Sequence, residues 1–129
     1  MNESIVYIDT SQVHAGKLNE LKAAMESLAQ FVEANEPRII AYNVYFTPDG
    51  TQMSVLHIHR DLASLEFHMK VAGPAFPGFA QFIKLLSIDI YGRPSAELLE
   101  QLQHKARLLG TGKVLIHDLH AGFAQLASR

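Results

Sequence analysis

Residues 38–60 read RIIAYNVYFTPDGTQMSVLHIHR, two segments rich in β-branched and aromatic residues on either side of Pro48-Asp49-Gly50. Proline, aspartate and glycine in this order are typical of a turn, because proline presets one backbone angle and glycine accepts the left-handed conformation. The pattern therefore predicts two strands, over 38–47 and 52–60, that pair as an antiparallel hairpin.

A strand and a helix are predicted on each side of this hairpin. Before it, residues 4–10 have the composition of a strand, and apolar residues three or four apart over 16–34 form one stripe of a helix. After it, Asp61 caps a second helix that ends at the Gly73–Gly78 stretch. A short helical piece then leads into a strand over 86–91.

These elements follow the order β-α-β-β-α-β, which predicts an α+β fold of ferredoxin-like topology. In that topology both helices lie on one face of an antiparallel sheet. A third helix begins at Pro94-Ser95, and Val114-Leu115-Ile116 begins like a possible fifth strand. We interpret residues 1–94 as a ferredoxin-like domain and residues 95–129 as a C-terminal helical extension of the same domain.

Size and charge exclude several classes of function. The chain has 129 residues, a formal net charge of −2 and no cysteine. The length fits one domain, and the balanced charge argues against nucleic acid or an acidic membrane as the main partner. Without cysteine there are no disulfides, thiolate nucleophiles or iron–sulfur sites. Because no apolar run reaches the ~20 residues that cross a bilayer and the N-terminus is polar, we expect a cytoplasmic protein.

The strands carry the most informative pattern. Side chains alternate between the two faces of a strand, so each strand splits into two sets. One set is nearly all apolar, and we expect it under the helices: Val6, Ile8, Ile40, Tyr42, Val44, Phe46, Leu56, Ile58, Leu86, Ile88 and Ile90. The opposite set mixes aliphatic residues with phenols, imidazoles and a carboxamide: Tyr7, Asp9, Ala41, Asn43, Tyr45, Val55, His57, His59, Ser87, Asp89 and Tyr91.

The second set suits a face that is covered but lined for hydrogen bonding. A washed sheet surface would favour lysine, glutamate and threonine instead. Two such sheets packed face to face would enclose a polar pocket in a homodimer. A plain dimer interface also favours tyrosine, and the two interpretations are compatible because the interface can itself enclose the pocket.

Several short motifs resemble a known family. They are the strand over 4–10, Ala15-Gly16-Lys17-Leu18 at the helix entry, Glu36-Pro37 before the next strand, and His68 within Leu65-Glu66-Phe67-His68. Over roughly residues 4–92 the chain is similar to the antibiotic-biosynthesis-monooxygenase-like domains of the dimeric α/β-barrel superfamily. The resemblance implies a homodimer whose two sheets form a barrel, with a ligand cavity inside the barrel or between each sheet and its own helices.

The same resemblance implies a range of activities. Similar proteins include cofactor-free oxygenases of quinols and polyketide phenols, haem-degrading enzymes and many proteins of unassigned role. This chain departs from some of the oxygenases by having no tryptophan. It also carries the longer C-terminal stretch, 95–129, whose Leu99, Leu102, Ala106 and Leu109 lie on one helical face. We expect that face to pack on the partner subunit or to wrap the barrel.

The leading hypothesis is a cofactor-independent monooxygenase that acts on a small, electron-rich aromatic molecule. Such a substrate must lose a proton before it reduces oxygen, so the protein must supply a base, orienting hydrogen bonds and a dry cavity. Imidazole titrates near neutral pH, which makes His57, His59 and His68 the candidate catalytic residues. The candidate substrate-binding residues are Tyr7, Asp9, Asn43, Tyr45, Asp89 and Tyr91, with Phe76 as a lid.

Two alternatives stay open. In His57-Ile58-His59 the two imidazoles share one face of a strand about 6.5–7 Å apart. A metal-dependent enzyme would then need a third ligand, such as Asp89, Asp9 or His68. The other alternative is a non-catalytic homodimer that binds a small molecule or has a purely structural role.

Overall fold

The computed structural model describes residues 4–125 of the chain. Five strands form one sheet: β1 (Ile5–Val13), β2 (Ile39–Phe46), β3 (Gln52–His59), β4 (Ile83–Tyr91) and β5 (Val114–His117). The helices are α1 (Leu18–Asn35), α2 (Leu62–Ala72) and α3 (Ala96–Leu109), with a 3₁₀-helical segment η1 (Gly73–Gln81) between α2 and β4. The predicted order of elements is confirmed, including the fifth strand.

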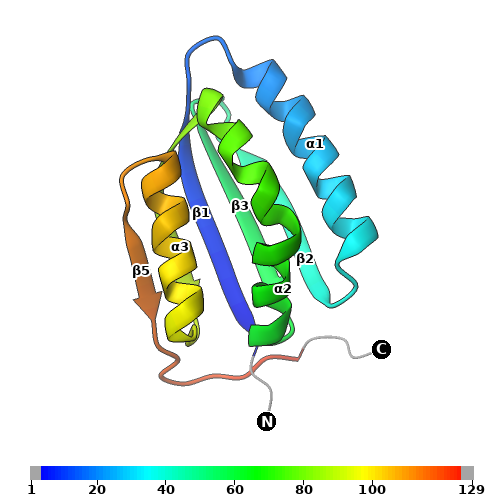
Figure 1. The fold of residues 1–129 in the computed structure, drawn as a ribbon, viewed down its shortest axis with the longest axis vertical. Coiled ribbons are helices and arrows are strands. Elements are labelled where there is room, and N and C mark those ends of the chain that lie inside the picture. The colour runs from blue at the N-terminus through cyan, green and yellow to red at the C-terminus, as the bar shows by residue number, and fades with distance from the viewer. Residues whose placement is uncertain (1–3, 126–129) are drawn as a thin grey trace.

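The sheet has the strand order β2-β3-β1-β4-β5. All neighbours pair antiparallel except β4 and β5, which are parallel. Figure 1 shows the three helices side by side on one face of this sheet, so the described chain forms an open two-layer structure and not a closed barrel. The ferredoxin-like topology expected from the sequence is therefore confirmed.

Local sequence explains where the elements begin and turn. The Asp49 carboxylate in the β2–β3 turn accepts a hydrogen bond from the Thr51 backbone N–H at 3.0 Å, and Gly50 has a φ of 73°. Asp61 caps α2 as predicted, because its side chain accepts from the Ser64 backbone N–H at 2.9 Å. The Gly73–Gly78 stretch ends α2 as predicted, and it forms most of the 3₁₀-helical segment η1 rather than a loop.

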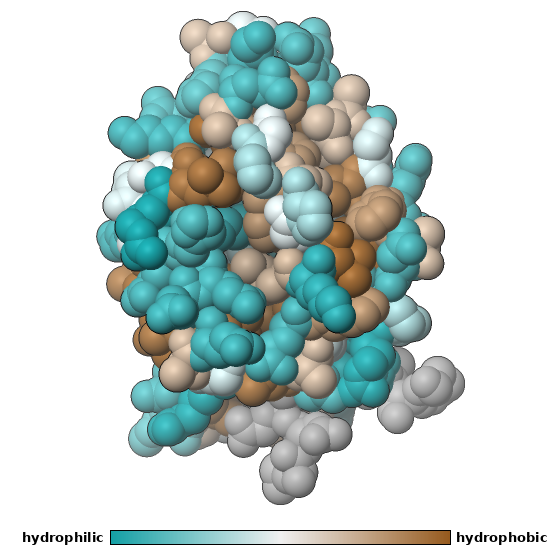
Figure 2. Space-filling view, viewed as in Figure 1, coloured by the Kyte–Doolittle hydropathy of each residue, from teal (hydrophilic) through white to brown (hydrophobic). Residues whose placement is uncertain are grey.

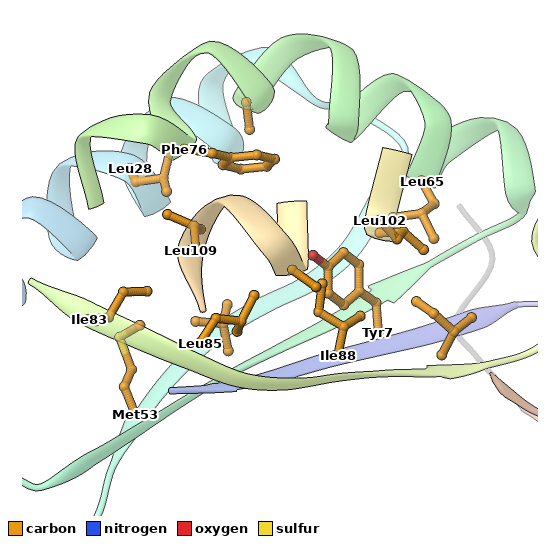
Figure 3. Close-up of a cluster of buried hydrophobic side chains, with 14 of the residues drawn as sticks. Tyr7, Leu28, Met53, Leu65, Phe76, Ile83, Leu85, Ile88, Leu102 and Leu109 are labelled. Atoms are coloured by element: carbon orange, nitrogen blue, oxygen red, sulfur yellow. The ribbon is translucent and has the colours of Figure 1, made fainter. Parts of the chain in front are cut away.

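The core lies between the helices and the sheet. Figure 3 shows its apolar side chains filling this space, with Leu28, Leu65 and Leu102 reaching down from the helices. The predicted stripe of α1 is buried as Leu21, Met25, Leu28 and Val32. None of the described helices is long and apolar enough to cross a membrane. The expected cytoplasmic location stays a prediction.

The packing of α3 differs from the expectation. Its buried residues are Leu98, Leu102, Lys105, Ala106 and Leu109, and they face β4 and η1 of the same subunit. The expectation that this stripe packs on a partner or wraps a barrel is therefore wrong. The helix ends where the backbone of Gly110 lies directly on β4, since a Cβ there would be 2.0 Å from the carbonyl oxygen of Leu85.

The assignment of faces is wrong for β1 and β3. Tyr7, Asp9, His57 and His59 are buried under the helices, while the apolar residues expected there lie half-buried on the open face: Val6, Ile8, Leu56 and Ile58. Paired residues on neighbouring strands share a face, and Tyr7 pairs with both His57 and Ile90. Tyr7 therefore has to follow Ile90 to the helical side.

Two features explain why the inner face of the sheet could not be predicted from the sequence. The central strands carry apolar residues on both faces, such as Ile5 and Val55 beneath the helices, so alternation alone does not identify the inner side. The register also shifts near Ile40 in β2 and near Leu86 in β4, and a single inserted residue reverses the alternation beyond it.

Candidate functional site

A carboxylate–imidazole pair lies at the centre of the helical side. His68 on α2 faces Glu36, which directly follows α1, and both side chains are 1% exposed. Nδ1 of His68 is 2.9 Å from each carboxylate oxygen of Glu36. Because a carboxylate accepts, Nδ1–H of His68 donates to Glu36, and Nε2 has no hydrogen-bond partner in the protein. Glu36 thus fixes the ring so that Nε2 is the nitrogen left to bond a bound molecule.

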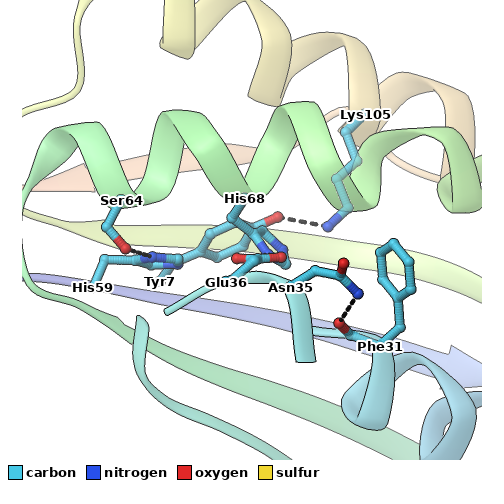
Figure 4. Close-up of polar contacts among 8 residues, drawn as sticks. All are labelled: Tyr7, Phe31, Asn35, Glu36, His59, Ser64, His68 and Lys105. Carbon is cyan, nitrogen blue, oxygen red and sulfur yellow. Dashed lines mark hydrogen bonds and ion pairs between the residues drawn. The ribbon is translucent and has the colours of Figure 1, made fainter. Parts of the chain in front are cut away.

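A buried cation lies on the other side of the same interior. The ammonium of Lys105 donates to the Tyr7 hydroxyl at 2.6 Å and to the Asp9 carboxylate at 3.1 Å, as Figure 4 shows for the tyrosine. It also lies 4.1 Å from the centroid of the Phe76 ring. Burial, and then the charge of Asp9, raise the pKa of the Tyr7 hydroxyl. The lysine thus presents positive charge inside a buried layer.

His57 and His59 join these groups from β3. The ring of His57 stacks on Tyr7 with 4.3 Å between centroids and meets His68 edge-on at 4.7 Å. Burial, reinforced by the neighbouring His68, lowers the pKa of His57, and the same two causes lower the pKa of His59 to about 3. Both rings are therefore neutral near pH 7, and His59 Nδ1 is 2.9 Å from the hydroxyl of Ser64.

Some of these side chains line a small cavity in the same interior. Its space for water-sized molecules is about 40 Å³, enough for roughly three waters at ~10–15 Å³ each. The polar residues of its wall are Asp9, Ser11, Tyr42, His57, His68 and Lys105. The rest of the wall is aliphatic or aromatic, so the cavity combines a few convergent polar groups with apolar surroundings, as ligand sites do.

Several buried atoms around this interior have no hydrogen-bond partner in the protein. Among the described residues they are both ring nitrogens of His57, Nε2 of His59 and of His68, and the hydroxyl of Ser11. A buried polar group without a partner costs about 1–3 kcal/mol, so such groups need a water or a ligand to bond. Three of the four residues line the cavity. These unpartnered atoms are therefore available to form hydrogen bonds with a bound molecule.

The predicted site residues divide between the two faces of the sheet. The cavity side brings together the three candidate histidines with Tyr7, Asp9 and Phe76. Asn43, Tyr45, Asp89 and Tyr91 lie on the open face instead, where the carboxylate of Asp89 lies 2.8 Å from Nε2 of His117. The prediction that all these residues line one pocket is therefore wrong, because they form two groups on opposite faces of the sheet.

Sequence reasoning missed three members of the inner group. Glu36 was considered only as part of the Glu36-Pro37 motif before the second strand, while Tyr42 was placed among the apolar residues. Lys105 carried a usable signal. It lies three residues after Leu102 and four before Leu109, so a charged residue interrupts a buried stripe.

The positions of the candidate ligands do not support the alternative of a metal site at His57 and His59. Within residues 4–125, no group of three or more histidine, aspartate or glutamate side chains is arranged to hold a metal ion. Asp89, one of the suggested third ligands, lies across the sheet from His57 and His59, because it pairs with Ile8 on the open face. It does not complete a site with them.

No family model matches the sequence, and no curated protein matches it. Solved structures do: MupZ from Pseudomonas fluorescens has a TM-score of 0.75 at 18% identity, over 97% of this chain and 91% of its own. A candidate antibiotic biosynthesis monooxygenase from Caulobacter crescentus has a TM-score of 0.62 at 20% identity, over 69% and 88%.

SnoaB, a cofactor-independent oxygenase from Streptomyces nogalater, has a TM-score of 0.60 at 12% identity and matches 72% of this chain and 95% of its own. The chain thus shares the fold of these solved structures. Because the match with MupZ covers 97% of this chain, it includes α3, the helix that supplies Lys105.

Proposed function

We propose that this protein is a cofactor-independent monooxygenase that acts on an electron-rich phenol or quinol between its sheet and its own helices. The observation that carries the proposal is the buried Glu36–His68 pair, whose Nε2 has no hydrogen-bond partner in the protein and lies among other unpartnered polar atoms. The fold, which the chain shares with SnoaB, adds to this argument only as an analogy.

The chemistry needs a proton acceptor first. Nε2 of His68 takes the phenol proton, and Glu36 stabilises the imidazolium that forms. The phenolate is a better one-electron donor to oxygen than the neutral phenol. Recombination of the two radicals forms a carbon–oxygen bond, and breaking the oxygen–oxygen bond leaves a quinone and one water. The water carries the two hydrogens that the phenol loses, the hydroxyl proton returned by His68 and one ring hydrogen, so the substrate itself supplies all four electrons that oxygen takes up.

The lysine has a separate role in this proposal. The ammonium of Lys105 donates to Tyr7 and Asp9, which leaves one of its three N–H groups for the developing anion. His57 is neutral and unpartnered, which suits it to orient the substrate by a hydrogen bond. The low polarizability of the buried surroundings strengthens both interactions, and a substrate that fills the cavity would keep water away from the radical intermediates.

A homodimer is part of the proposal. The open face of the sheet carries half-buried Val6, Ile8, Leu56 and Ile58, with exposed Tyr45 at its β2 side. An apolar sheet face without a covering layer is unusual in a lone soluble subunit, because sheets bury such faces against another layer. A second copy of the chain, packed face to face, would cover it.

The decisive experiment follows oxygen uptake with a panel of alkylated hydroquinones and naphthols. In the variant His68→Gln we expect kcat to fall by roughly 10²–10⁴-fold, the contribution typical of a positioned base. Glu36→Gln should also lower kcat, since the histidine loses its orienting carboxylate. The matched control is His120→Gln, which changes an exposed histidine far along the chain and should leave turnover unchanged.

Two results would contradict the proposal. Equal turnover by wild type and His68→Gln would remove the histidine as base. Tight binding of the panel without any oxygen uptake would favour the non-catalytic alternative, a homodimer that binds a small molecule.

A further inference from the structure

A long groove on the helical side adjoins the interior cavity. It runs between α2 and α3 and has about 1120 Å³ of space. Phe76 and Lys105 line both the groove and the cavity, so these two side chains form the wall between them. Figure 2, which views this helical face, shows hydrophobic residues lying among hydrophilic ones. The groove is therefore an outer space that leads to the proposed reaction site.

The cavity alone is too small for the proposed substrate. Its 40 Å³ is far below the ~300–1000 Å³ of typical small-molecule sites, whereas the groove exceeds that range. The wall between them rests on side chains. Phe76 belongs to the short segment η1, and its ring contacts the Lys105 ammonium at 4.1 Å. Rotation of either side chain would join the two spaces.

The lining of the groove indicates what can lie in it. Its charged residues balance, since the carboxylates of Glu66, Glu97 and Glu100 oppose the cations of Lys70, Lys105 and Arg107. Between them stand apolar side chains, of which Phe67 is 43% and Leu108 45% exposed. A groove without net charge and with exposed apolar residues favours an uncharged aliphatic chain over an ionic one.

We infer that the substrate is elongated, with its reacting polar head in the cavity and an aliphatic tail in the α2–α3 groove. This inference rests on the proposed function for the identity of the head. The tail is deduced from the groove itself, from its continuity with the cavity at Phe76 and Lys105, and from the small volume of the cavity. A substrate with a short tail would leave the groove unfilled and bind with lower affinity.

The experiment measures binding without turnover. Dissociation constants are determined by calorimetry in anaerobic buffer for 4-alkylphenols and for n-alkyl carboxylates, each from methyl to octyl. We expect the dissociation constant of at least one series to fall with tail length, by up to about fourfold per buried methylene. In the double variant Phe67→Ser, Leu108→Ser this dependence should be lost, while 4-methylphenol should bind as in wild type.

The matched control is Phe31→Ser, which removes an equally exposed aromatic ring from α1, outside the groove. It should keep the full dependence on tail length. No dependence on tail length with either head, or an equal dependence in the groove variant, would overturn the inference. A change of oligomeric state in the groove variant would overturn it too, because the groove would then hold a second copy. A tail effect without oxygen uptake would refute the proposed function alone.

Discussion

The Lys105–Asp9 pair allows a prediction that does not depend on activity. The two side chains are only 8% and 9% exposed, and Nζ lies 3.1 Å from Oδ2. At an effective dielectric constant of ~20 this separation corresponds to an attraction of ~5 kcal/mol, which offsets the cost of taking both charges out of water. Lys105→Met keeps most of the volume but leaves the carboxylate of Asp9 buried without its cation.

We expect Lys105→Met to lower the free energy of unfolding by about 3–5 kcal/mol, the usual cost of removing one partner of a buried pair. For 129 residues, with an unfolding entropy of ~2.1 cal/mol/K per residue, this corresponds to a fall in Tm of roughly 10–20 °C. The double variant Asp9→Asn, Lys105→Met should recover at least half of the loss, because it removes both charges.

Urea unfolding followed by circular dichroism measures all three free energies, and the cycle is completed with Asp9→Asn alone. If the two single effects simply add in the double variant, the ammonium and the carboxylate are not coupled. The placement of Lys105 inside the site would then be wrong. A double variant that is near wild type in stability would instead show that the pair is retained for binding and not for folding.

Three more outcomes are expected. Burial lowers the pKa of His57 and lowers that of His59 to about 3. Below the ordinary histidine pKa of ~6.5 the unfolded chain therefore binds more protons than the folded chain. The free energy of unfolding should then fall as the pH falls below ~6.5, by up to ~1.4 kcal/mol per pH unit for each histidine. Urea midpoints at pH 7, 6 and 5 check this, and His59→Gln should make the slope shallower. Leu102 in α3 is fully buried, so Leu102→Ala should lower the free energy of unfolding by about 2–5 kcal/mol. Leu108 is exposed, so Leu108→Ala should change the free energy of unfolding in urea by less than ~0.5 kcal/mol. Ile8→Lys on the open face should convert the proposed dimer into monomers in analytical ultracentrifugation, and an unchanged sedimentation coefficient would exclude that face as the interface.

The order of elements was predictable because it depends on local signals. Pro48-Asp49-Gly50 sets the hairpin, Asp61 caps α2, and the helical stripes repeat every three or four residues. Each of these signals is read within a few residues of the chain. They determine where strands and helices begin, and the ferredoxin-like topology follows from their order.

The site was only partly predictable because it depends on register. His57, His59 and His68 were recognised as chemically suitable, yet the side of the sheet on which the strand histidines lie follows from pairings such as Tyr7 with Ile90. Two inserted residues in β2 and β4 reverse the alternation. Glu36 contacts His68, and Lys105 contacts Tyr7, across segments 32 or more residues apart in the chain. No local pattern indicates Glu36, and only the charge that interrupts the buried stripe of α3 indicates Lys105.

The contact at Gly110 has a consequence for how this interior can change. Backbone meets backbone there, and no rotamer can make room for even a methyl group 2.0 Å from the Leu85 carbonyl oxygen. The contact thereby fixes the distance between the last turn of α3 and β4. Because Lys105 lies about one turn earlier in the same helix, the contact also fixes the distance of its backbone from Tyr7. A residue that takes no part in any reaction works as the spacer that sets the reach of the ammonium, so a single added methyl group at that position would lift the charge away from its acceptors.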